Sequence, residues 1–189
     1  MPIAFHDAEE VEELGHALFL HVARQSESEW LGALLFLNAR GEPLEFVYNR
    51  IELLSGVLWR PADRERAAVR RLALTLFAAA TLSPTLLLCR AAAVPPHLLG
   101  SGGQIELEVP VGRIATPQEA VGYAGAEQQQ SIAALGEGAG DNEEAHVFWS
   151  PAPQGRAEEL FARLASRGLL LEPFERASRG LSEIYGEAS

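Results

Sequence analysis

The sequence predicts one domain of mixed α/β (α+β) class, with a central, mostly antiparallel sheet that begins as a three-strand meander and has helices packed on it. Three observations predict this class. Strand-length apolar segments open the chain, one long run of strong helix formers follows, and strand-like and helix-like segments alternate towards the end. At 189 residues, 48% of them hydrophobic, the chain is long enough to bury a core without disulfides.

The meander is predicted from three apolar segments and one turn. Apolar residues alternate with other residues, or run continuously, over residues 17–24, 30–37 and 44–53. Between the last two segments, Asn38 opens a four-residue turn and Gly41 stands where a left-handed backbone is needed. This pattern is typical of a hairpin closed by a type I turn with a glycine bulge.

A long helix is expected over residues 62–82, because Pro61 suits a first helical position and Pro84 prevents continuation. The later elements follow from local pattern. Part of 124–135 is expected to be helical. Strands are expected at residues 85–89, 105–111, 146–149 and 169–172, with helices at about 154–167 and after Pro173.

The opening order of three strands, a helix and a strand resembles the ribonuclease-H-like arrangement, and profilin-like and roadblock-like modules begin in comparable ways. A ribonuclease-H-like nuclease would need several carboxylates around two Mg²⁺ ions, usually with one on the first strand. Residues 17–24 contain no acid. The acids expected on strands, which are catalytic candidates for this alternative only, are Glu45, Glu52, Glu106 and Glu108.

The net charge of −11 is concentrated in two segments of the single domain, residues 1–189. Residues 1–15 contain five acids and residues 116–145 contain six, and neither segment contains a base. We expect an acidic N-terminal segment and a flexible, acidic insertion rich in Gly and Gln. Because the remainder is charge-balanced, nucleic acid is an unlikely partner except through one basic helix.

All fifteen basic residues are arginine, which excludes a Schiff-base lysine and a Walker-type phosphate lysine. Five arginines between residues 60 and 71 give the expected helix a basic start. This stretch either forms a solvated face, paired with the acidic segments, or meets a partner. The candidate binding residues are Arg60, Arg64 and Arg71, which share roughly one helical face, together with Trp59 and Trp149.

Other familiar chemistry is absent from the sequence. The five histidines and Cys89 show no metal-ligand spacing, so no metal or other cofactor is expected. A lone cysteine and the lack of a leader favour the cytoplasm. The apolar stretch 72–88 contains Pro84 and is expected to be a buried helix followed by a strand, not a membrane span.

These patterns lead to one functional hypothesis and two alternatives. We expect a non-catalytic, protein-binding adaptor or assembly subunit of a bacterial cytoplasmic complex, whose partner is another protein or a second copy. Residues 32–50 resemble bacterial proteins, although this resemblance supplies no mechanism. The first alternative is a metal-dependent nuclease or nucleic-acid-processing protein of ribonuclease-H-like build. The second, a small-ligand or sensor module, would require a sizeable apolar pocket with converging polar groups.

Overall fold

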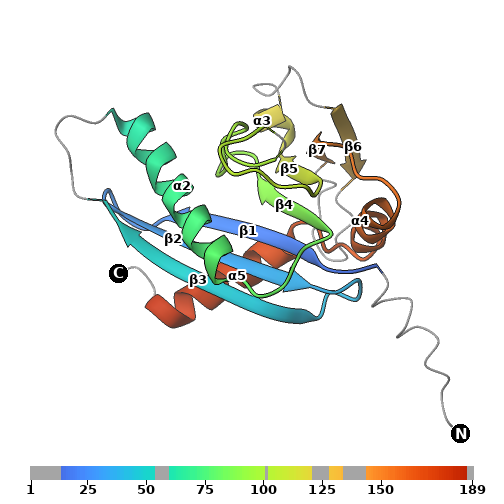
Figure 1. The fold of residues 1–189 in the computed structure, drawn as a ribbon, viewed down its shortest axis with the longest axis horizontal. Helices are drawn as coiled ribbons and strands as arrows, with labels where there is room; N and C mark the ends of the chain where they lie inside the picture. The colour runs from blue at the N-terminus through green and yellow to red at the C-terminus, as the bar shows by residue number, and fades with distance from the viewer. Residues whose placement is uncertain (1–13, 54–59, 101, 121–127, 134–143, 187–189) are drawn as a thin grey trace, which may run out of the picture.

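The computed structural model describes residues 14–53, 60–100, 102–120, 128–133 and 144–186 (Figure 1). In these residues seven strands form one mixed sheet, in the order β3-β2-β1-β4-β5-β7-β6. The mixed α/β class predicted from the sequence is confirmed. The strands are β1 (Ala17–Arg24), β2 (Glu29–Leu37), β3 (Pro43–Glu52), β4 (Leu86–Arg90), β5 (Val111–Ala115), β6 (Gln128–Ala133) and β7 (Glu144–Ser150).

Strand directions divide the sheet into an antiparallel half and a parallel centre. β2 is antiparallel to both β1 and β3, whereas β1, β4 and β5 are parallel neighbours. β7 then pairs antiparallel with both β5 and β6. The carboxyl ends of the three parallel strands, at Arg24, Arg90 and Ala115, therefore point to the same edge of the sheet, which we call the carboxyl edge.

The predicted hairpin between β2 and β3 is confirmed at Asn38. Its side-chain oxygen accepts hydrogen bonds from the backbone N–H groups of Arg40 and Glu42, at 2.9 and 3.0 Å. The backbone N–H of Gly41 donates to the carbonyl of Asn38, and Gly41 adopts a φ of 81°. A glycine takes this left-handed conformation without the steric cost that a side chain adds.

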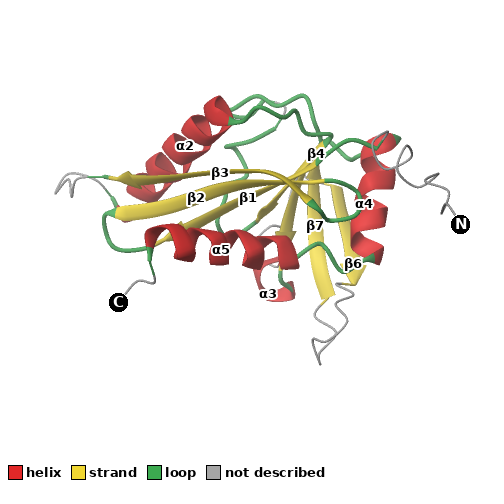
Figure 2. Ribbon diagram, turned by 90° about the horizontal axis from the view of Figure 1, so that it is seen from below, coloured by secondary structure: helices red, strands yellow, loops and turns green. Residues whose placement is uncertain are grey.

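The helix α2 (Pro61–Ala79) covers one face of the sheet (Figure 2). Its buried residues, Ala68, Val69, Leu72, Ala73 and Leu76, recur at helical spacing and pack in one cluster with Leu18, Leu20 and Leu34. β4 begins after Pro84, so the expected change from buried helix to strand is confirmed. Among the described helices, none combines the length and apolar character needed to cross a membrane.

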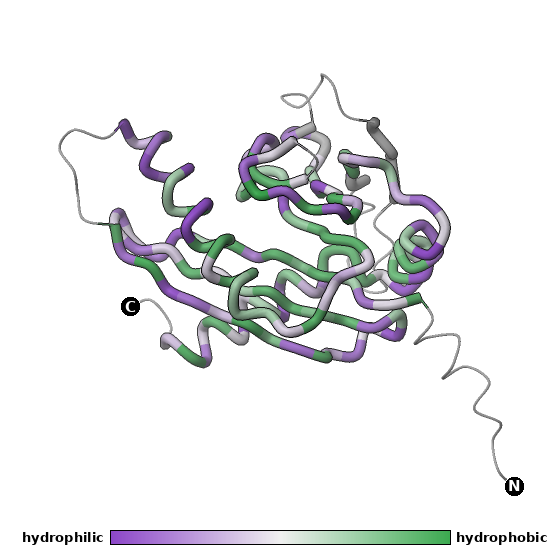
Figure 3. Tube along the Cα trace, in the orientation of Figure 1, coloured by the Kyte–Doolittle hydropathy of each residue, from purple (hydrophilic) through white to green (hydrophobic). Residues whose placement is uncertain are grey.

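The opposite face of the sheet is covered by α4 (Arg156–Ser166) and α5 (Glu172–Tyr185). Phe19 of β1 packs edge-on against Phe174 of α5, with ring centroids 5.4 Å apart. The central strands are mainly hydrophobic along their length, while the start of α2 is hydrophilic (Figure 3). The sheet is thus a buried layer between helices, and the polar start of α2 lies beside its carboxyl edge.

Three expected elements differ from the structure. Of the expected strand 105–111, residues 105–110 form only an isolated bridge, between Leu99 and Ile105, since Glu106 and Glu108 are exposed and Pro110 has no N–H to donate; Val111 begins β5. Residues 169–171 form a turn, because Pro173 lies in the first turn of α5 and the helix begins at Glu172. Within 124–135, the described residues form the strand β6.

The two acidic segments lie largely outside the described residues. This is the case for residues 1–13, 121–127 and 134–143. At the start of the second acidic segment, the short helix α3 (Pro117–Ala120) follows β5 and begins with a reciprocal pair of hydrogen bonds between Thr116 and Glu119. The division into a single domain with acidic segments at 1–15 and 116–145 stays a prediction.

Candidate functional site

The carboxyl edge carries cationic side chains. Arg24 ends β1 and Arg90 ends β4. Three residues before Arg24, the side chain of His21 is largely buried, and no partner for its Nε2 lies in the described part of the chain. Burial lowers the pKa of His21, and the nearby charge of Arg90 lowers it further, so the neutral imidazole is favoured. The cations at this edge are therefore the two arginines.

Five arginines on α2 and its N-cap form a second cationic group, which we call the arginine surface: Arg60, Arg64, Arg66, Arg70 and Arg71. Arg66 forms an ion pair with Asp63. For the other four arginines, the described residues supply no carboxylate within 4.0 Å. Most of the positive charge of this helix is therefore not neutralised by neighbours.

Two open hollows flank α2. One, of about 490 Å³, is lined by Leu53, Arg66, Ala67, Arg70, Arg71, Leu74 and Gln104. The other, of about 380 Å³, lies between the first half of α2 and the chain that follows β4, and its lining is mainly alanine, with Glu65, Arg66, Val69 and Pro95. Open α/β sheets generally bind ligands outside the carboxyl ends of their strands, which is where this second hollow lies.

The arginine surface meets the sheet at Trp30, the second residue of β2. Trp30 is only 2% exposed, and the guanidinium carbons of Arg24 and Arg64 lie 5.6 and 5.5 Å from the centroid of its ring. Arg24 and Trp30 are direct partners in the pairing of β1 with β2. One indole thus holds one arginine from the carboxyl edge and one from α2.

The four candidate glutamates do not converge. Glu45 on β3 accepts hydrogen bonds from the N–H and hydroxyl of Thr81, at 3.0 and 2.8 Å, and from the N–H of Leu82, at 3.0 Å. Burial alone would raise the pKa of Glu45, but these hydrogen bonds outweigh it and hold the pKa below its usual value. Glu45 therefore has a structural partner at the end of α2.

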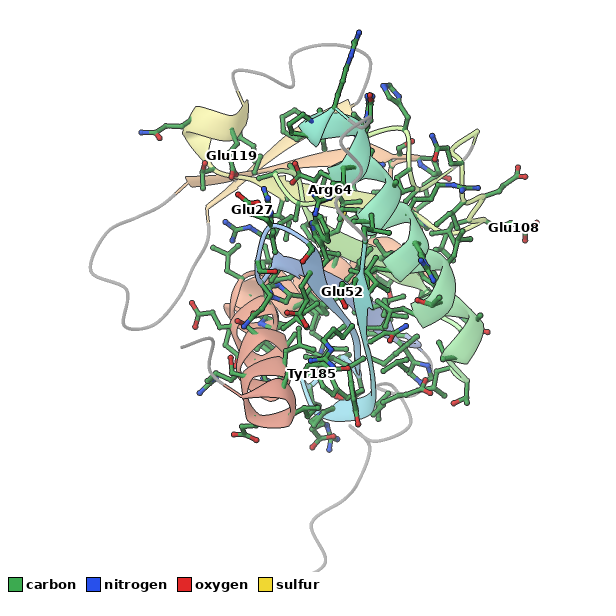
Figure 4. All side chains as sticks on the ribbon, turned by 90° about the vertical axis from the view of Figure 1, so that its left-hand side faces the viewer. Glu27, Glu52, Arg64, Glu108, Glu119 and Tyr185 are labelled. Carbon is green, nitrogen blue, oxygen red and sulfur yellow. The ribbon has the colours of Figure 1, made fainter. Side chains whose placement is uncertain are left out.

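Glu52 and Glu108 are exposed, and Figure 4 shows them well apart, with Glu52 near the centre of the view and Glu108 at its right-hand margin. Glu106 is also exposed, in the chain before β5. Across the described ranges, no three His, Cys, Asp or Glu side chains come together in a group that could hold a metal ion. The donor set needed for two Mg²⁺ ions is thus not present in that part of the protein.

Of the two tryptophans proposed as binding residues, only Trp149 lies in the described part of the chain, and it is buried. Trp149 on β7 is 3% exposed and packs edge-on against Phe161 of α4, with ring centroids 4.9 Å apart. Its side chain contributes to the core and not to an exposed surface. Trp59 lies outside the described residues.

Sequence reasoning missed three residues that organise this region: Arg24, Trp30 and Arg113. Arg113 is fully buried on β5, and its Nη2 donates to the carbonyls of Pro96 and Leu99, at 2.7 and 2.8 Å. The available signal was an arginine inside the apolar run Val111–Ala115. Arg113 fixes the long connection after β4 against the sheet, close to the carboxyl edge.

Comparison with known proteins finds likeness in structure alone. No protein-family model matches the chain, and no curated protein matches it. The crystal structure of human endonuclease V aligns with a TM-score of 0.55 and 14% identity, over 94% of this chain and 87% of that chain. The enzyme from Bacillus subtilis aligns with a TM-score of 0.53 and 11% identity, over 94% and 85%. Endonuclease V from Ciona intestinalis, in complex with a 24mer DNA containing an inosine followed by a ribo-adenosine, aligns with a TM-score of 0.51 and 11% identity, over 95% and 98%.

These neighbours correct the functional hypothesis. The prediction of a non-catalytic, protein-binding adaptor is wrong, because the neighbours named above, which share this fold over nearly the whole chain, are endonucleases. The prediction of a protein partner in preference to nucleic acid is also wrong, since one of these neighbours was solved with DNA bound. At 11 to 14% identity the likeness shows one thing, which is that this chain has the fold of endonuclease V.

Proposed function

We propose that this protein binds nucleic acid, as a nucleic-acid-processing protein of ribonuclease-H-like build, and that the phosphate backbone lies on the arginine surface of α2. The observation that carries the proposal is the unneutralised charge of that surface. Of its five arginines, only Arg66 has a carboxylate partner among the described residues. With Asp63 and Glu65 on the same helix, these five arginines leave a local charge of +3.

The chemistry of the arginine surface supports phosphate as the group it meets. A guanidinium group presents five N–H donors in a planar fork that matches phosphate oxygens. Arg66, Arg70 and Arg71 line one open hollow together with Leu53, Ala67, Leu74 and Gln104, so three arginines border the same concave surface. Phosphate contacts supply much of the affinity of proteins for nucleic acid, and they need only local positive charge.

The fold adds a second line of support. Endonuclease V from Ciona intestinalis has the same fold and was solved with a DNA strand. The net charge of −11 does not oppose the proposal, because eleven of the acids lie in the segments 1–15 and 116–145.

The proposal concerns binding first, because the catalytic candidates of the nuclease alternative are dispersed. Glu45 holds the end of α2, while Glu52, Glu106 and Glu108 are exposed, and no three such side chains form a metal-binding group in the described part of the chain. No hydrolytic step is derived from these four residues.

Equilibrium binding to a fluorescently labelled 24mer DNA, in single-stranded and duplex form, tests the proposal. We expect the wild type to bind at about 50 mM salt and the triple variant Arg60→Gln, Arg70→Gln, Arg71→Gln to bind at least about tenfold more weakly. Glutamine is a good helix former, so α2 should be preserved. Arg156→Gln, at an exposed position on α4, is the matched control and should bind as the wild type does. Absence of binding by the wild type at low salt would contradict the proposal.

A further inference from the structure

Arg24 and Arg64 both lie against the ring of Trp30 at the carboxyl edge. Each guanidinium carbon lies within 5.6 Å of the centroid of the Trp30 ring, so the two carbons are at most twice that distance apart. Arg24 comes from the end of β1, and Arg64 extends from α2 towards the sheet (Figure 4). Two segments forty residues apart in sequence thus place two cations over one side chain.

This pair is not neutralised within the part of the chain that the structure describes. The Nε of Arg24 donates to the carbonyl of Ser26 at 3.0 Å, and Nη2 of Arg64 donates to the carbonyl of Leu53 at 3.4 Å. Neither arginine has a carboxylate within 4.0 Å among those residues. Most of their N–H donors are therefore unused, and the indole offsets only part of the repulsion between the two charges.

The arrangement is not one that stability alone favours. Nε of Arg64 and Nε1 of Trp30 are buried, and neither has a hydrogen-bond partner among the described residues. Buried donors without partners cost free energy, and two unpaired cations in proximity add to that cost. In return, each guanidinium group has two contacts that favour one position, the buried ring of Trp30 and one backbone carbonyl. Donors held in place before a ligand arrives lose less entropy on binding.

We propose that Arg24 and Arg64, held by Trp30, form a phosphate-binding site for a nucleic-acid strand at the carboxyl edge. This proposal rests on the proposed function and adds a second contact, beyond the hollow formed by Arg66, Arg70 and Arg71 on the outer side of α2. The site takes an anion directly because this edge presents arginines, whereas a magnesium ion would require carboxylates. Binding at this site therefore needs no divalent metal.

The test measures the affinity and its salt dependence for the single variants Arg24→Gln and Arg64→Gln in the full chain, with the labelled 24mer DNA and EDTA present. We expect each variant to bind about tenfold more weakly than the wild type. We also expect the slope of log K against log salt to become shallower by about 0.7 to 0.9 for each phosphate that the variant no longer binds. Arg156→Gln should change neither quantity. Arg64→Lys keeps the charge but loses the planar group, so its affinity should fall while its slope stays close to that of the wild type.

The outcomes separate this site from the proposed function. If Arg24→Gln and Arg64→Gln bind with wild-type affinity and slope while the triple variant at Arg60, Arg70 and Arg71 is weakened, the phosphate site at Trp30 is wrong and binding through α2 stands. If the wild type binds no nucleic acid, both proposals fail. Loss of binding in EDTA alone would overturn the metal-independent site. Arg24 is exposed on its strand, so its variant carries the test even if Arg64→Gln proves unstable.

Discussion

The carboxylate of Glu45 on β3 accepts hydrogen bonds from both the backbone N–H and the hydroxyl of Thr81, which follows the end of α2. A further bond comes from the N–H of Leu82. A glutamate that could have been a metal ligand by sequence is thus a connection between the edge strand and the helix that carries the arginine surface.

Replacement of Glu45 by alanine should therefore lower the free energy of unfolding by roughly 1 to 3 kcal/mol at neutral pH, because several hydrogen bonds to a charged group are removed. Urea denaturation measures the decrease. Glu52→Ala is the matched control, since Glu52 is exposed on the same strand and should cost little. The pKa of Glu45 is lowered in the folded state, so its contribution is present above the ordinary glutamate pKa and is lost as the pH falls through the folded-state value. Equal stability of the two variants at neutral pH would exclude this role.

The lowered pKa of His21 leads us to expect a second pH dependence of the free energy of unfolding, independent of Glu45. Its pKa is lowered from 6.5 by burial and by the charge of Arg90, so just below pH 6.5 the unfolded chain binds more protons than the folded chain. Stability should therefore fall as the pH drops from about 7 to about 5. His21→Leu should flatten that decline, while His97→Gln, at an exposed position, should leave it unchanged. Thermal melts across this range measure the slopes, and an unaltered slope in His21→Leu would refute the assignment.

The hydrogen bonds of Arg113 lead us to expect that the connection after β4 needs this buried side chain to stay packed on the sheet. Arg113→Met removes the donors to the carbonyls of Pro96 and Leu99, so we expect a decrease of roughly 2 to 3 kcal/mol in unfolding free energy. Limited proteolysis should also become faster within residues 95–105. Arg179→Met, at a side chain that is 72% exposed, provides the comparison and should change neither measurement. Unchanged protection of 95–105 in Arg113→Met would show that other contacts hold this connection.

The meander could be predicted because each of its signals is local. Alternating or continuous apolar runs of strand length identify the strands, and the Asn38 to Gly41 turn fixes the antiparallel order of the second and third. The strand before residue 116 was predicted at 105–111, whereas β5 occupies Val111–Ala115. Residues 105–111 alternate as a half-exposed strand does, and the arginine within Val111–Ala115 made that run look unsuited to a buried strand. The carbonyls of Pro96 and Leu99, in the connection before β5, accept hydrogen bonds from that buried arginine, and no local sequence pattern indicates this contact.

The candidate site was less predictable than the fold. The charge on α2 is visible in the sequence, but the position of Arg64 over Trp30 depends on how the helix packs on the sheet. The pairing of Arg24 with Trp30 depends on strand register. Convergence of carboxylates is likewise a property of the tertiary structure, so the sequence alone could not decide whether the four glutamates meet.

The salt dependence of wild-type DNA binding tests the central claim most directly. We predict that log K falls linearly with log salt between about 50 and 200 mM, with a slope of about −2.8 for single-stranded DNA and about −3.6 for duplex DNA if Arg24, Arg64, Arg70 and Arg71 each contact one phosphate. Fluorescence anisotropy with the labelled 24mer gives K at each salt concentration. A wild-type protein that binds no nucleic acid at low salt, or whose affinity is independent of salt, would contradict the account.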